Sequence, residues 1–185
     1  MSQTSLSLLD YALLGLVHDQ APCSGYDLRK VFAETPMGSF SDSPGSIYPA
    51  LARLERAKLI RGRIEETAAV RRRKLFRLSA AGQRVLERWL RRPITQADLI
   101  HGFRELALRF AFFESVLGRK ACVPFLEALA TELAAYIPVL RQHLDIQRAT
   151  KSLSVSLAME GGVMSYETQL AWARLALDRL QRPRR

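Results

Sequence analysis

The stretch SPGSIYPALARLERAKLIRGRIEE, residues 43–66, decides how this 185-residue chain folds. Its first half has helical periodicity, and its second half alternates as a strand does. The apolar residues of the helical half fall on one face: Ile47, Ala50, Leu51 and Leu54. The opposite face carries small residues and arginines: Gly45, Ser46, Pro49, Ala52, Arg53 and Arg56, with Tyr48 at the border. This pattern predicts a helix that buries one face and leaves the other bare.

Pro49 leaves two starting points open for this helix. Proline lacks an N–H group and clashes with the preceding turn unless it lies near a helix start. Ser46 caps the helix if Pro49 belongs to the first turn, whereas Ser43 caps it if the helix continues through a kink at Pro49. The sequence does not choose between the two.

The elements around this helix have a recognisable order. Apolar spacing predicts helices over Leu6–His18 and after Ser24, whose hydroxyl is a cap with Asp27 three residues later. Alternating strands follow at Leu59–Glu65 and Arg73–Ser79, joined by residues 66–72, and Ser79 caps a helix to about Arg92. Three helices followed by a hairpin predict a winged helix-turn-helix domain over residues 1–92.

Residues 93–185 are predicted to form a second, all-α domain that begins at Pro93. We expect three helices and no strand, with a kink at Pro138 in the second helix and an interruption or weakening at Gly161–Gly162 in the last. The fold class is therefore mainly α with a small β-hairpin. A 3-4-3-4 repeat and the next apolar stripe predict dimer contacts through Phe103, Leu106, Phe110, Phe113, Leu117, Leu133 and Leu140.

The charge of the chain is concentrated in one place. Its net charge is +10, and residues 53–77 alone hold 10 Lys and Arg against 3 Asp and Glu. A local excess of this kind suits a polyanion, and a solvated basic surface without a partner is the alternative.

Other classes of protein are disfavoured. Two cysteines make no disulfide framework, the first residues lack the pattern of a signal peptide, and no apolar run approaches the roughly 18 residues of a membrane span, so we expect a cytoplasmic protein without a membrane partner. The three histidines are scattered, and no catalytic or phosphate-loop motif is present. We therefore expect neither an enzyme nor a bound metal or cofactor.

The bare helix face and the hairpin carry the predicted DNA contacts. Small residues allow the backbone to approach base edges, Ser46 and free N–H groups of the first turn can hold a phosphate, and Arg53 or Arg56 can contact guanine or the backbone. The basic hairpin is expected to hold adjacent phosphates. The predicted contacts are Gly45, Ser46, Tyr48, Pro49, Arg53, Arg56, Arg71, Arg72, Arg73 and Lys74.

Three stretches resemble the PadR family of bacterial transcriptional regulators: YALLGLVHDQAPCSGYDLRKVF, SPGSIYPALARLERAKLI and RRRKLFRLSAAGQRVLERWL. The resemblance covers about residues 6–92, and FRELALRFAFF (Phe103–Phe113) is similar to the helical C-terminal domain of longer members, which include virulence activators. It implies a dimeric regulator, usually a repressor released by a small molecule, with DNA contacts from Ser46, Tyr48, Pro49, Arg53 and residues 71–74. The chain departs from the pattern at Val70, where glycine is common, and at Leu75-Phe76, where two aromatics are common.

The sequence therefore predicts a homodimeric, sequence-specific regulator that binds a double-stranded DNA operator, expected to be an inverted repeat. A ligand or a partner that binds at the junction of the two domains would change the spacing of the two recognition helices of the dimer. The alternatives are a small-molecule binding module with a vestigial wing and a co-activator that acts through a partner regulator. The operator, the effector, its binding residues and the sign of regulation are left open.

Overall fold

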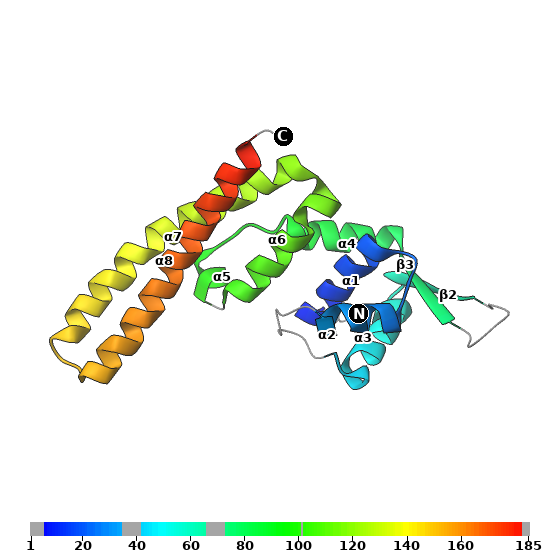
Figure 1. The fold of residues 1–185 in the computed structure, drawn as a ribbon, viewed down its shortest axis with the longest axis horizontal. Coiled ribbons are helices and arrows are strands. Elements are labelled where there is room, and N and C mark those ends of the chain that lie inside the picture. Colours follow the sequence, from blue (N-terminus) through cyan, green and yellow to red (C-terminus); the bar gives the residue numbers. More distant parts are fainter. Residues whose placement is uncertain (1–5, 35–41, 66–72, 101, 183–185) are drawn as a thin grey trace. The chain divides into compact units, whose positions relative to one another are not determined.

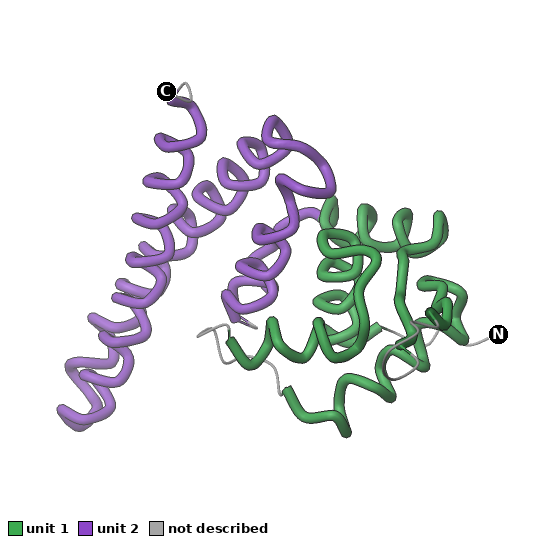
Figure 2. The backbone as a smooth tube through the Cα atoms, turned by 45° about the vertical axis from the view of Figure 1, so that its right-hand side comes forward, with its two compact units in different colours: residues 1–92 green, residues 93–185 purple. Residues whose placement is uncertain are grey.

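A computed structural model of the chain describes residues 6–34, 42–65, 73–100 and 102–182. The chain divides into two compact units, residues 1–92 and residues 93–185 (Figure 2). Each unit is described by itself below.

The first unit contains four helices and a small antiparallel sheet among its described residues (Figure 1). The strand order is β1-β3-β2, so a third strand joins the predicted hairpin. That strand has only two residues, too few to show alternation in sequence, and pairs Cys23 with Phe76 and Ser24 with Leu75. The elements are α1 (Leu8–Gln20), β1 (Cys23–Ser24), α2 (Gly25–Glu34), α3 (Pro44–Arg56), β2 (Ile60–Glu65), β3 (Arg73–Leu78) and α4 (Ala80–Leu90).

The start of α3 resolves the choice that the sequence leaves open. Ser43 is the N-cap, its hydroxyl accepts the N–H of Gly45 at 3.2 Å, and Pro44 occupies the first helical position. Pro49 therefore lies inside the helix. The predicted buried face is confirmed, since Ile47, Ala50, Leu51 and Leu54 are all buried.

A tight cap ends α3 and turns the chain into β2. The N–H of Lys58 donates to the carbonyl of Glu55 at 2.8 Å, and the N–H of Leu59 donates to that of Leu54 at 2.9 Å. This is the Schellman pattern, which requires a left-handed residue, and Lys58 takes that place with φ 59°. A lysine there is strained, because left-handed backbone favours glycine.

The beginning of α4 closes over this cap. The hydroxyl of Ser79 donates to the carbonyl of Lys58 at 2.7 Å, and its N–H donates to the carbonyl of Leu59 at 2.9 Å. Ser79 also caps α4, as predicted, by accepting the N–H of Gly82. A Cβ on Gly82 would lie 2.1 Å from the carbonyl oxygen of Leu59. Only glycine allows this approach, which fixes the end of the recognition helix against α4.

The described residues of the second unit form four helices, where the sequence predicted three. They are α5 (Gln96–Ile100), α6 (Phe103–Leu117), α7 (Arg119–Arg148) and α8 (Leu153–Gln181). The five residues of α5 are too short for a periodic signal. Of the interruption or weakening predicted at Gly161–Gly162, the interruption is wrong, because α8 is continuous there. In Figures 1 and 2, α7 and α8 lie side by side as a long antiparallel hairpin.

The aromatic seam of α6 is filled by its own chain. Phe103 and Phe110 each meet Trp172 of α8 edge-on at a centroid distance of 5.3 Å. Phe113 lies 4.6 Å from Phe125 of α7 between ring centroids. These contacts form the core of the second unit.

This packing corrects part of the predicted dimer contact. Leu106, Phe113 and Leu133 are buried inside the single chain, so they are not available to a partner. The seam repeats like a coiled coil because α7 and α8 supply the facing side chains. The remaining predicted contacts are partly exposed: Phe103, Phe110, Leu117 and Leu140.

By length and composition, α7 is apolar enough to cross a membrane, contrary to the expectation from the sequence. It carries Glu127 and Glu132 among its apolar residues and runs through both Pro124 and Pro138. Its leucine side chains at 126, 129 and 133 are buried within the unit. A core helix of a helical bundle has these same properties.

Candidate nucleic-acid interface

The face of α3 that is turned away from the core is open. Gly45, Pro49, Ala52 and Arg56 are exposed, Tyr48 is 46% exposed, and Ser46 is partly exposed. Because Pro49 lacks an N–H group, the carbonyl of Gly45 lacks its usual helical donor. A hydrogen-bond acceptor is thus left on the bare face, near the helix start.

The cap changes one prediction about this face. Pro44 has no N–H group, that of Gly45 donates to Ser43 Oγ, and that of Ser46 donates to the Ser43 carbonyl at 3.0 Å. The expectation that free first-turn N–H groups at Ser46 hold a phosphate is therefore wrong. The hydroxyl of Ser46 remains as the polar group there.

Tyr48 is held at the border of the face by α2. A Cβ on Gly25 would lie 2.6 Å from Tyr48 Cε1 and 3.2 Å from Leu51 Cδ1, so the ring needs glycine at this position. Because β1 pairs with β3, this contact lies beside the base of the hairpin. A hollow of about 590 Å³ opens there, lined by Ser24, Gly25, Tyr26, Tyr48, Arg73, Lys74 and Phe76.

Arg53 is engaged by a buried acid. Its Nη2 donates to Asp10 Oδ1 at 2.9 Å, and Asp10 is only 3% exposed. The other oxygen of Asp10 accepts the N–H and the hydroxyl of Ser7 in the capping box of α1. Arg53 therefore ties α3 to α1, although 45% of its side chain is still exposed.

Lys74 is also engaged by an acid. Its Nζ lies 2.6 Å from Glu55 Oε2, on α3. The ammonium group also lies 5.7 Å from the ring centroid of Phe76. Two of the predicted DNA contacts, Arg53 and Lys74, are thus held by carboxylates of the first unit.

The hairpin has one face toward the core and one face of arginines. The register pairs Ile60 with Leu78 and Gly62 with Phe76, and these residues share the first face. On the second face Arg61 lies directly opposite Arg77, a like-charge pair that destabilises a sheet. The exposed arginines of the second face are Arg61, Arg63, Arg73 and Arg77.

None of these four arginines forms a salt bridge within the described residues. The sequence-based selection included Arg73 but missed Arg61, Arg63 and Arg77. The sequence shows that these arginines alternate along their strands. It does not show the register between the two strands, which places them on one face. Arg71 and Arg72 lie outside the described residues.

Three titratable groups with shifted pKa values, Asp27, Cys23 and Cys122, have structural roles. A backbone hydrogen bond from Ser24 lowers the pKa of the Asp27 carboxyl, which completes the predicted cap of α2. Burial raises the pKa of the Cys23 thiol to about 11, and Cys122 is likewise a buried free thiol with a raised pKa. Both cysteines therefore stay protonated at neutral pH, as expected for packing residues. In the part of the chain that the structure covers, no metal-binding group of His, Cys, Asp and Glu side chains is present.

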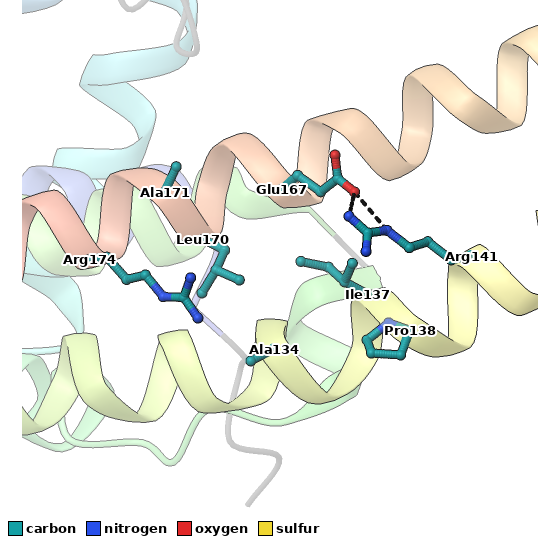
Figure 3. Close-up of a pocket in the computed structure, with 8 residues that line it drawn as sticks. All are labelled: Ala134, Ile137, Pro138, Arg141, Glu167, Leu170, Ala171 and Arg174. Atoms are coloured by element: carbon teal, nitrogen blue, oxygen red, sulfur yellow. Dashed lines mark hydrogen bonds and ion pairs between the residues drawn. The ribbon is translucent and has the colours of Figure 1, made fainter.

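The second unit has a groove of about 450 Å³ between α7 and α8 (Figure 3). Arg141 closes one side of it by an ion pair with Glu167, with Nε at 2.9 Å from Oε1. The apolar lining consists of Ala134, Ile137, Pro138, Leu170 and Ala171. Arg174 reaches over this lining from α8.

Comparison with known proteins identifies the first unit. Residues 13–88 match the transcriptional regulator PadR-like family. No curated protein sequence matches the chain.

Among solved structures, Bacillus subtilis PadR in complex with operator DNA is similar at 22% identity, over 96% of this chain and 99% of that chain, with a TM-score of 0.44. Bacillus subtilis PadR in complex with p-coumaric acid is similar at 22% identity, over 95% and 100% of the two chains, with a TM-score of 0.41. A Streptococcus transcriptional regulator is 30% identical over 45% of this chain and 82% of that chain, with a TM-score of 0.35.

The expectations of a DNA-binding regulator and of a protein that is not an enzyme both agree with this family, whose members regulate transcription. The winged helix-turn-helix order of residues 1–92 and the match over residues 13–88 lead to one assignment. Residues 13–88 of this chain form a domain of the transcriptional regulator PadR-like family.

Proposed function

We propose that the chain acts as a homodimer that binds an inverted-repeat operator and represses transcription until a small molecule releases it. The observation that carries the DNA-binding part is the pair of exposed surfaces on the first unit. One is the bare face of α3, and the other is the arginine face of the hairpin.

The two surfaces suit different parts of a DNA duplex. Small side chains and the free carbonyl of Gly45 allow α3 to approach base edges in the major groove. The opposed Arg61 and Arg77 repel each other and form no salt bridge in the part of the chain that the structure describes, and phosphates would relieve that repulsion. The arginines of the hairpin therefore supply affinity, while α3 supplies sequence preference.

The proposed contacts follow from exposure and from existing partners. Arg53 and Lys74 already hold carboxylates, so their first role is to position α3 and the hairpin. The proposed direct contacts are Gly45, Ser46, Tyr48, Pro49, Arg56, Arg61, Arg63, Arg71, Arg72, Arg73 and Arg77.

The proposed dimer uses the α7–α8 hairpin. Large apolar side chains are exposed on both helices of this hairpin in the single chain. A second copy of the chain would cover them. A two-fold dimer also explains why the operator should be an inverted repeat. The exposed residues are Val139, Ile146, Leu153, Val155, Leu157, Met164 and Leu175.

Repression and release by a small molecule rest on the resemblance to the family. Promoter occupancy in a purified transcription reaction tests the sign of regulation, because a repressor lowers transcript in proportion to occupancy. The ligand in one of the compared structures, p-coumaric acid, is the first compound to test for release from DNA.

The DNA contacts are tested by salt titrations of anisotropy, on a duplex selected from a random pool and on a scrambled duplex. Replacing Arg71, Arg72 and Arg73 by alanine should lower the slope of log affinity against log salt by about 4, for about two phosphate contacts per subunit. The specificity ratio should change by less than about tenfold. The control replaces Arg84, Arg88 and Arg91, which removes the same charge from α4 and its C-terminal cap.

Equal losses in both triple variants would mean that only net charge matters. Equal affinity of the wild type for selected and scrambled duplexes would contradict a sequence-specific regulator. Weak binding that a second protein restores would support the co-activator alternative.

A further inference from the structure

The Glu55–Lys74 contact is unusual for its place in the molecule. Glu55 is the one acidic residue of α3, and it lies on the helix assigned to DNA. A carboxylate beside DNA phosphates is unfavourable unless a cation neutralises it. The Nζ of Lys74, on β3, neutralises it at 2.6 Å from Glu55 Oε2.

The sheet is built to admit this contact. Gly62 pairs with Phe76, and Lys74 is two residues before Phe76, so its side chain crosses diagonally over Gly62. A Cβ on Gly62 would lie 2.2 Å from Lys74 Cε and 2.7 Å from Glu55 Oε1. Both halves of the ion pair thus use the space that glycine leaves.

The contact has a predictable electrostatic effect. A lysine whose charge is matched by a carboxylate releases no condensed counterion when the hairpin meets DNA. On the other face of the same strands, Arg61 and Arg77 lie opposite each other and form no salt bridge within the described residues. Because of its ion pair with Glu55, Lys74 has a positioning role, whereas the arginines of the other face bind phosphates.

We propose that Glu55 is a positioning residue, which holds Lys74 over Gly62, joins the recognition helix to the hairpin and keeps Lys74 out of the phosphate contacts. This rests on the proposed DNA-binding function. It also sets how many phosphates each subunit contacts, and hence how strongly salt weakens binding.

The test is a double-mutant cycle on the salt slope, with Glu55→Gln, Lys74→Met and the double variant of the full-length protein on a scrambled duplex. Lys74→Met should leave the wild-type slope unchanged. Glu55→Gln should free Lys74 and steepen the slope by about 1.8 per dimer, at roughly 0.9 for each phosphate. Lys74→Met should then remove that gain in the Glu55→Gln background.

Asp19→Asn is the matched control, because it removes an exposed acid of the first unit that forms no salt bridge within the described residues. It should change the slope by much less than Glu55→Gln. An equal change in both variants would overturn the proposal in favour of a net-charge effect. Equal loss of slope for Lys74→Met in both backgrounds would make Lys74 an ordinary phosphate contact.

A second readout is independent of DNA. The shifts in thermal midpoint caused by Glu55→Gln and Lys74→Met should be non-additive, because either one breaks the same contact. Additive shifts would show that the bridge is absent. A non-additive cycle in a protein that binds no DNA would retain the bridge and reject the proposed function instead.

Discussion

The two units leave different kinds of side chain uncovered. The first exposes arginines on its hairpin and a bare helix face, whereas the second exposes apolar side chains along α7 and α8. Repulsion between opposed arginines is relieved by an anion, and apolar surface is stabilised when another apolar surface covers it. The difference shows how one chain can present a polyanion-binding surface and a self-association surface in separate compact units.

The largest effect should come from Gly82→Ala, which places a methyl group against the carbonyl oxygen of Leu59. The clash is with backbone, so it cannot be relieved by a side-chain rotation, and we expect a loss of about 3 kcal/mol or more in unfolding free energy. The end of α3 should lose its anchor, and DNA binding should be lost with it. Circular dichroism and denaturant unfolding measure the change, and the α7–α8 helices and the dimer should persist. Loss of the dimer as well would mean that the units do not fold separately.

The second-largest effect should be a weaker dimer after charged substitutions on α8. Leu157→Asp and Met164→Glu introduce charges where the exposed apolar side chains of α8 are proposed to meet a second copy. We expect dissociation to increase by roughly 30-fold, which corresponds to about 2 kcal/mol. Sedimentation measures this against Ile64→Glu, the same kind of change at an exposed apolar residue of the first unit. An undisturbed dimer would place the interface off α8.

Substitutions of Arg53 and Arg56 should differ in their effect on the stability of the first unit. Arg53→Ala leaves the buried Asp10 carboxylate without its cation, so the first unit should lose about 2 kcal/mol of unfolding free energy. Arg56→Ala should leave the unfolding free energy unchanged within about 0.5 kcal/mol, since Arg56 makes only a long hydrogen bond, from Nε to the Ala52 carbonyl at 3.4 Å, among the described residues. Denaturant unfolding of both variants is the measurement. If Arg53→Ala is as stable as Arg56→Ala, the ion pair with Asp10 is not maintained in solution.

The smallest effects should be stabilising. Lys58→Gly relieves a left-handed residue at the C-terminal cap of α3, and Gly161→Ala adds helix propensity in α8, where a Cβ meets nothing within 4 Å. Each should raise unfolding free energy by up to about 1 kcal/mol, the first in unit 1 and the second in unit 2. Differential scanning calorimetry would detect both. A loss of stability for Gly161→Ala would indicate that a partner chain approaches α8 at this glycine.

Local patterns in the sequence were sufficient for most elements. The apolar face of α3, the caps at Ser24 and Ser79, the two long strands and the fold class follow from periodicity and capping chemistry, which act within a few residues. The two-residue β1 and five-residue α5 were missed, because elements this short have no period. The start of α3 stayed open because Ser43 and Ser46 satisfy the same local rule.

By itself, then, the sequence determined where the longer helices lie, which face of α3 is bare and where the positive charge is concentrated. Only the tertiary structure decided which basic side chains form ion pairs with carboxylates of the same chain. Arg53 and Asp10 are 43 residues apart, Lys74 and Glu55 are 19 apart, and the face shared by Arg61 and Arg77 depends on strand register. The sequence likewise showed that one face of α6 is apolar. Only the positions of α7 and α8 decided that helices of the same chain cover this face. Periodicity in the sequence shows which side chains must be buried or paired, and long-range packing determines which residues they contact.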